Sequence, residues 1–162
     1  MADLHIDDFY RDCALILLRL YGTFPRKTIL YVDDICGPDS PDEFGLHSER
    51  HQSCFSAMVW LAEAGYVSFT ETIREEALDQ AVLTQRGFLL LSSRSQIDLG
   101  MPEDEAQDDS LPPSVMERSM TNVMQVRRAL REGSSIITQQ VMHYLLQQPH
   151  PSLTVGSPEP PA

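Results

Sequence analysis

Three side chains that could bind a metal ion recur at helical spacing near the middle of the chain. His47, His51 and Cys54 stand at positions i, i+4 and i+7, which would place them on one face of a helix, and Cys36 could supply a fourth ligand. Imidazole nitrogen and thiolate sulfur are common zinc ligands. However, we expect His47 to precede the helix and Cys54 to continue an apolar stripe, and no CxxC pair accompanies them. The pattern favours a buried thiol with surface histidines and no cofactor, with a metal site as the alternative.

Carboxylates that could act in catalysis gather just before these residues, at Asp33, Asp34, Asp39, Asp42 and Glu43. An enzyme would combine such groups with a device that activates a nucleophile or holds a phosphate. The chain contains no glycine-rich phosphate loop, no nucleophile elbow and no HExxH motif. Because a charge run of this kind is usually a solvated face, the sequence predicts a protein that is not an enzyme and has no small-molecule substrate.

A helix, a pair of strands and a second helix would position these side chains. Ser48 is a good N-cap, and apolar residues follow at helical spacing until a glycine ends the helix. The stretch 66–70 alternates as a strand does, and 81–83 is short enough to be its antiparallel partner across the connection 71–80. Thr84 can cap a further helix of sequence TQRGFLLL.

Three segments are expected before the helix that Ser48 caps. Asp7 or Asp8 can cap a first helix that runs to about Tyr21, with apolar residues at three- and four-residue spacing on one face. The segment KTILYVDDICG begins as a β-favouring run and ends as a short helical turn. The next stretch, 37–47, holds the prolines, glycines and acidic residues that are typical of a loop.

This order of elements, together with the GYV and LTQRG turns, resembles that of winged helix-turn-helix domains over about residues 7–92. The resemblance implies an α+β fold, mostly α, in which the helix after Ser48 is the recognition helix and 71–80 is the wing. We therefore predict a winged-helix domain over 1–92. Because each of its elements has one apolar face, we expect four large side chains to be buried together: Trp60, Leu61, Phe69 and Phe88.

In winged-helix domains that bind DNA, the recognition helix enters the major groove and the wing touches phosphate. Four residues could make such contacts here, namely Arg50, Gln52, Ser53 and Arg74. The expected wing is mostly acidic, however, and the chain has 24 acidic against 12 basic residues, a net charge of -12 that would repel a polyanion. We therefore predict a recognition module that engages a protein partner or assembly rather than DNA. The alternative is a DNA-binding transcriptional regulator that dimerises through its C-terminal helices.

The rest of the chain divides into a linker, a helical part and a tail. An acidic segment without periodicity, 93–113, is the expected linker, and the Pro-rich tail, 149–162, is expected to be disordered. Between them, 114–148 favours a helical hairpin whose first helix begins with the capping box of Ser114 and Glu117. An apolar stripe on that helix is the candidate partner-binding or dimerisation surface: Met116, Met120, Val123 and Leu130. Folding back onto the winged helix and dimerisation are both open.

The cysteines and the apolar runs indicate the cellular setting. Cys13, Cys36 and Cys54 are an odd number of cysteines without the spacing of a disulfide framework. The acidic N-terminus lacks a positive leader region, and the longest apolar run, 13–18, is far shorter than the roughly 20 residues that a membrane span needs. We therefore expect a cytoplasmic protein that does not enter a membrane.

Overall fold

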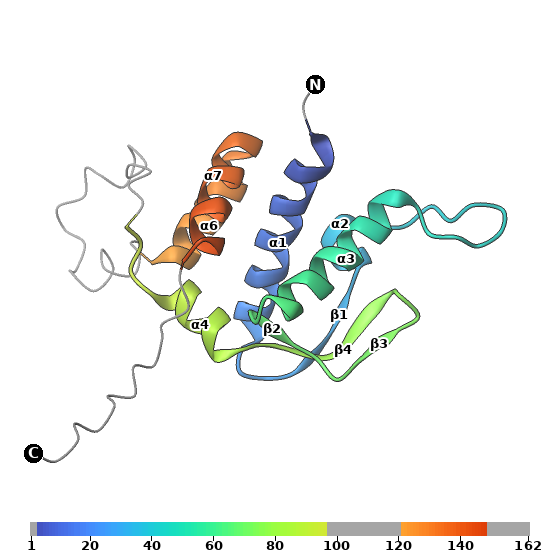
Figure 1. The fold of residues 1–162 in the computed structure, drawn as a ribbon, viewed down its shortest axis with the longest axis horizontal. Coiled ribbons are helices and arrows are strands. Elements are labelled where there is room, and N and C mark those ends of the chain that lie inside the picture. The colour runs from blue at the N-terminus through green and yellow to red at the C-terminus, as the bar shows by residue number, and fades with distance from the viewer. Residues whose placement is uncertain (1–2, 97–120, 149–162) are drawn as a thin grey trace, which may run out of the picture.

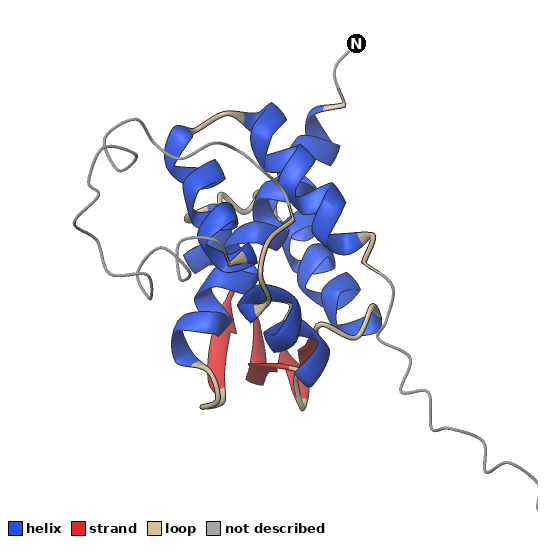
Figure 2. Ribbon diagram, turned by 90° about the vertical axis from the view of Figure 1, so that its left-hand side faces the viewer, coloured by secondary structure: helices blue, strands red, loops and turns tan. Residues whose placement is uncertain are grey.

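The fold is α+β, with helices gathered against a small antiparallel sheet at one end of the molecule (Figure 1, Figure 2). The computed structural model describes residues 3–96 and 121–148. The predicted class, α+β and mostly α, is confirmed. Within these two stretches the elements follow in this order: α1 (Leu4–Thr23), β1 (Thr28–Tyr31), α2 (Asp33–Cys36), α3 (Glu49–Glu63), β2 (Val67–Ser68), β3 (Glu71–Ile73), β4 (Ala77–Leu83), α4 (Gln85–Ser92), α6 (Asn122–Glu132) and α7 (Ser135–Leu146).

Helix α1 is the element against which most of the others pack. It contacts α3, α6, α7 and β4, and it lies between the other long helices in Figure 1. The helix begins at Leu4 after Asp3, so the predicted cap at Asp7 or Asp8 is wrong. Asp7 instead lies in the first turn, where a carboxylate interacts favourably with the helix dipole. The buried side of α1 is apolar at helical spacing: Cys13, Ala14, Ile16, Leu17 and Leu20.

Strand β4 is the centre of the four-stranded sheet, because it pairs antiparallel with β1, β2 and β3. The strand predicted at 81–83 begins earlier, at Ala77. The predicted connection 71–80 therefore contains β3 and the first half of β4. The β-branched residues Thr72 and Ile73 favour this extended backbone. The tight turn between the two strands places Arg74 and Glu75 at positive φ, +48° and +58°.

Helix α3 begins as predicted, because the Ser48 side chain accepts a hydrogen bond from the backbone N–H of His51. Its buried side includes Leu61, which is fully enclosed. Trp60, which we expected beside Leu61 in the core, is 41% exposed. The prediction of a shared core for the four large residues is wrong here, because successive positions on a helix point in directions about 100° apart. Phe69 is only partly buried as well.

Helix α4 closes one side of the core, again from the predicted cap, since the Thr84 side chain accepts a hydrogen bond from the N–H of Gly87. Phe88 is partly buried and stacks on the ring of Phe24, with centroids 4.3 Å apart. Gly87 packs directly on the backbone of Tyr66, and a Cβ atom there would lie 2.2 Å from the Tyr66 carbonyl oxygen. A glycine is therefore required where α4 crosses the start of β2.

Helices α6 and α7 form a hairpin that packs on α1. The two helices are joined by Gly133, whose backbone is left-handed, and Ser134, the N-cap of α7. Six of their side chains belong to the same buried cluster as those of α1: Val123, Val126, Ala129, Val141, Met142 and Leu145. Of the two docking modes that the sequence leaves open, the structure shows the intramolecular one. The hairpin completes the core instead of standing apart from it.

Parts of the predicted C-terminal organisation lie outside the described residues. These parts are the start of the first hairpin helix at Ser114, the side chains Met116, Glu117 and Met120, most of the linker 93–113, and the tail 149–162. The first residues of the linker are described, and Arg94 forms an antiparallel bridge with Thr121. None of the helices in the part of the chain that the structure describes is both long and apolar enough to cross a membrane.

Candidate functional site

A groove with a volume of about 560 Å³ runs between α1 and the exposed face of α3. Phe9 and Trp60 meet there edge to face, with ring centroids 5.1 Å apart. Because aromatic side chains are enriched at protein interfaces, this groove is the first candidate contact site. Four of its lining residues are apolar or aromatic: Ile6, Phe9, Ala57 and Trp60. Five are polar: His5, Glu49, Gln52, Ser53 and Ser56.

Arg50, a candidate DNA contact, is held by a buried carboxylate. Its guanidinium donates two hydrogen bonds to the carboxylate of Asp12, at 2.6 and 2.5 Å, and its Nε lies 3.7 Å from Asp8. The Asp12 side chain is 1% exposed and the Arg50 side chain 34%. The hydrogen bonds to Asp12 raise the pKa of Arg50 further above its ordinary value. The positive charge of Arg50 is therefore already neutralised by α1.

The other candidate DNA contacts lie in different surroundings. Gln52 is exposed, and its side-chain amide donates to the carbonyl of His47 at 2.8 Å. Ser53 lines the groove beside Trp60. Arg74 is exposed in the turn between β3 and β4, and the exposed charges around it in sequence are acidic: Glu71, Glu75 and Glu76. The four candidates do not form a basic surface.

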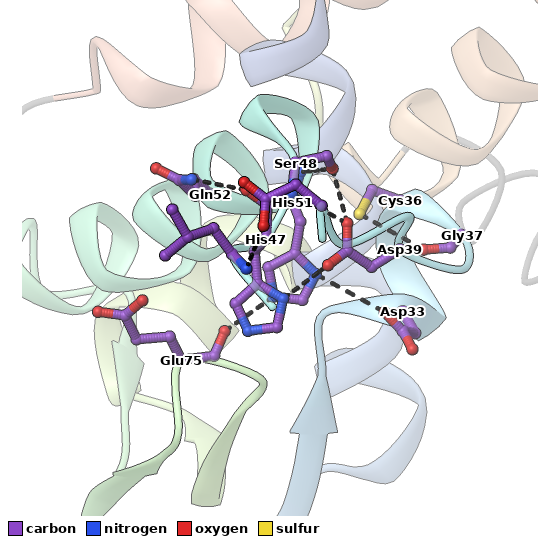
Figure 3. Close-up of polar contacts among 11 residues, drawn as sticks. Asp33, Cys36, Gly37, Asp39, His47, Ser48, His51, Gln52 and Glu75 are labelled. Atoms are coloured by element: carbon purple, nitrogen blue, oxygen red, sulfur yellow. Dashed lines mark hydrogen bonds and ion pairs between the residues drawn. The ribbon is translucent and has the colours of Figure 1, made fainter. Parts of the chain in front are cut away.

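The two histidines of the metal hypothesis do meet, together with Asp39 from the loop before α3 (Figure 3). The rings of His47 and His51 stack 3.9 Å apart and 8° from parallel. Nδ1–H of His47 donates to Oδ2 of Asp39 at 2.6 Å, and this bond raises the pKa of His47. Hydrogen bonds from Ser48 and His47 hold the pKa of Asp39 well below its ordinary value. We name this group, Asp39 with His47 and His51, the histidine cluster.

His51 is the buried member of the histidine cluster, with 2% of its surface exposed. Its Nε2 lies 2.9 Å from the carbonyl oxygen of Glu75, at the turn between β3 and β4. Its Nδ1 has no hydrogen-bond partner and faces two carboxylate oxygens, Oδ1 of Asp33 at 3.7 Å and Oδ2 of Asp39 at 3.8 Å. Figure 3 shows these carboxylates converging on the imidazole ring.

The cysteines of the metal hypothesis are not part of the histidine cluster. Cys54 is fully buried in the core, and burial raises the pKa of its thiol. Burial also raises the pKa of Cys36, whose Sγ contacts the carbonyl oxygen of Gly37 at 3.7 Å. Within the described residues, the side chains whose ligand atoms lie within 4.8 Å of one another are Asp39, His47 and His51, and neither thiol belongs to this group.

The candidate dimerisation stripe is divided by the structure. Val123 is 3% exposed and lies in the core shared with α1, and Leu130 is partly buried against the same core. Met116 and Met120 lie outside the described residues. The two described members therefore contact the chain's own core.

Asp12 and the exposure of Trp60 were not predicted from the sequence as features of these sites. Asp39 was predicted only as a possible catalytic carboxylate, not as a partner of the two histidines. Asp12 carried a usable signal, because it stands four residues before Ile16 on the apolar side of α1, where a carboxylate needs a cation. Asp39 lies in a loop without periodicity, so nothing in the sequence placed it beside His47 and His51.

Comparisons of this chain with protein-family models, with curated proteins and with solved structures found no match.

Proposed function

We propose that this chain is a non-enzymatic winged-helix recognition module that binds a protein partner through the groove between α1 and α3. The order of elements supports this assignment: a short strand and helix precede α3, and a hairpin of β3 and β4 follows it. The observation that carries the proposal is Trp60, a tryptophan 41% exposed at an aromatic-lined groove. Tryptophan is among the residues that most often dominate the binding energy of protein interfaces.

Charge determines the class of partner. The net charge of the chain is -12, and Glu49 lies on the polar side of the groove. A partner that places an apolar side chain against Trp60 and a lysine or arginine near Glu49 would be complementary in both respects. Such a partner is a protein with a basic, partly apolar surface.

DNA is the weaker candidate for the same face. A winged helix on DNA needs arginine or lysine near phosphate, because neutralised phosphates supply most of the affinity. Arg50 is bound to Asp12, and the hairpin of β3 and β4 that carries Arg74 exposes three glutamates. The dimeric DNA-binding regulator would further require Val123, now 3% exposed, to leave the core and face a second copy.

The proposal places the protein in the cytoplasm, where thiols stay reduced. The three cysteines of the chain, Cys13, Cys36 and Cys54, are all free thiols, and two of them are buried. Reduced, buried thiols are compatible with that compartment.

The test is a quantitative comparison of proteins captured from cells of the source organism by wild type and by three variants. Trp60→Glu places a charge at the groove, and Ser56→Arg fills the groove without removing a core side chain. Ile136→Glu is the control, because Ile136 is 66% exposed on α7, away from the groove. We expect one partner to be retained by Ile136→Glu and lost from both groove variants.

The DNA alternative is measured in parallel with a mobility-shift assay on random duplex DNA at about 150 mM salt. We expect no shift. A salt-sensitive shift that survives Trp60→Glu and is lost on Arg74→Ala would replace the protein-binding proposal with the DNA-binding one.

A further inference from the structure

The hydrogen bond between His51 and Glu75 fixes the tautomer of the His51 ring. A backbone carbonyl only accepts hydrogen bonds, so Nε2 of His51 must carry the proton that it shares with the Glu75 oxygen at 2.9 Å. In neutral His51 the other nitrogen, Nδ1, then has a free lone pair. Only 2% of the surface of His51 is exposed, and its Nδ1 has no hydrogen-bond partner. A buried acceptor without a donor is costly, so the arrangement calls for something that binds Nδ1.

The groups nearest to Nδ1 of His51 are acceptors as well. Asp33 and Asp39 present carboxylate oxygens at 3.7 and 3.8 Å, which are beyond hydrogen-bond distance. His47 stacks on the same ring and places its own Nδ1 at 2.6 Å from Asp39. One ligand atom each from Asp39, His47 and His51 lies within 4.8 Å of the other two. Imidazole and carboxylate ligand atoms thus lie close together.

We propose that Asp39, His47 and His51 form a binding site for a divalent transition-metal ion, with zinc as the best fit, and that Asp33 is the adjacent carboxylate available as a fourth ligand. Two imidazoles with one or two carboxylates are a donor set that suits zinc and its first-row neighbours rather than calcium or magnesium, which take oxygen ligands. None of these four residues lines the groove proposed for partner binding.

The distances fit this ion once the side chains move. Because the lone pairs of imidazole lie in the ring plane, the stacked rings of His47 and His51 must also turn toward a common point. A tetrahedral zinc site with bonds of about 2.0 to 2.1 Å holds its ligand atoms about 3.3 to 3.4 Å apart. The separation of 2.6 Å between His47 and Asp39 is shorter than this, and that of 3.8 Å between His51 and Asp39 is longer. Binding would replace the proton shared by His47 and Asp39 with the metal ion, so that these two groups move apart and His51 moves closer.

The hydrogen bond from Nε2 of His51 to Glu75 would orient the ligand, as second partners of metal-bound histidines usually do. The ion would therefore connect three parts of the fold: the loop 37–47 through Asp39 and His47, the first turn of α3 through His51, and the turn between β3 and β4 through the Glu75 carbonyl. Figure 3 shows these three segments meeting around the histidine cluster.

The experiment uses the full chain without an affinity tag, freed of metal with a chelator and titrated with zinc chloride by calorimetry. We expect saturable binding of one ion. His51→Gln and Asp39→Asn should each weaken zinc binding by about 10-fold to 100-fold or more. The matched control is His143→Gln, which removes a histidine on α7 outside the cluster and should leave the stoichiometry and the affinity unchanged.

Cobalt spectra of the wild type identify the ligands without relying on variants that could fold poorly. Cobalt bound by the histidine cluster should give the visible bands of a nitrogen and oxygen site and no thiolate-to-cobalt charge-transfer band. Cys36→Ser should leave both the spectrum and the zinc affinity unchanged. Absence of saturable zinc binding, a thiolate band, or equal affinity in wild type and in a folded His51→Gln protein would each overturn the proposal and leave His51 as a buried partner of two carboxylates.

Discussion

Replacing Arg50 by alanine should lower the free energy of unfolding by about 3 to 5 kcal/mol. The Asp12 side chain is 1% exposed and receives both Arg50 hydrogen bonds, at 2.6 and 2.5 Å. Breaking a buried ion pair by removing one partner costs about 3 to 5 kcal/mol, because the remaining charge has no compensation.

The converse change, Asp12→Ala, should cost about 2 kcal/mol or less. The Arg50 side chain is 34% exposed, so without Asp12 its guanidinium can turn to water or move closer to Asp8, which lies 3.7 Å from its Nε. The matched control is Arg19→Ala. Arg19 pairs with Asp34 at 3.1 Å while both side chains are 51% and 41% exposed, so its loss should cost less than about 1 kcal/mol.

Urea denaturation of the full chain at neutral pH, followed by circular dichroism, measures all three variants. The predicted order of destabilisation is Arg50→Ala, then Asp12→Ala, then Arg19→Ala. A loss for Arg50→Ala no larger than that for Arg19→Ala would show that the buried pair does not hold α3 to α1, and Arg50 would then be free to contact a ligand.

Three further predictions concern packing and pH. Gly87→Ala should destabilise the protein by about 3 kcal/mol in thermal or urea unfolding, because the new Cβ would lie 2.2 Å from a backbone oxygen; an unchanged midpoint would contradict this contact. Phe88→Ala should cost about 2 kcal/mol, less than the roughly 3 to 5 kcal/mol of a fully buried phenylalanine, because its ring is only partly buried. The hydrogen bond with Asp39 raises the pKa of His47 above its ordinary value of 6.5. In metal-free protein the pair of Asp39 and His47 therefore stabilises the fold fully below pH 6.5, and this contribution is lost as pH rises through the raised pKa. Asp39→Asn should therefore reduce stability more near pH 5.5 than near pH 8.5, and equal losses at about these two values would refute the pair.

The local elements could be predicted because their signals lie within a few residues. Ser48 and Thr84 cap α3 and α4 as expected, since an N-cap needs only its own side chain and a backbone N–H three residues on. The exposure of Trp60 could not be predicted in the same way. Apolar residues occupy so much of α3 that its sequence does not reveal which side faces α1.

The sites could be predicted only in part because their contacts are long-range. His47 and His51 were candidates from their spacing, but their partner Asp39 lies in a loop whose course no periodicity describes. Arg50 meets Asp12 across 38 residues of sequence. The position of Val123 likewise depends on how the C-terminal hairpin returns to α1, because an apolar stripe fits a dimer and a core equally well.

The central claim, that the groove between α1 and α3 binds a protein, is tested most directly by site-specific photo-crosslinking in cells of the source organism. A photoreactive amino acid replaces Ser53, which lines the groove without entering the core, and in a second protein it replaces Ile136, which is 66% exposed on α7. We predict that position 53 forms a discrete crosslink to a protein, that this crosslink is lost when Trp60 is also changed to glutamate, and that position 136 does not form it. A crosslink from position 53 to DNA, or the same protein crosslinked equally from position 136, would contradict the claim.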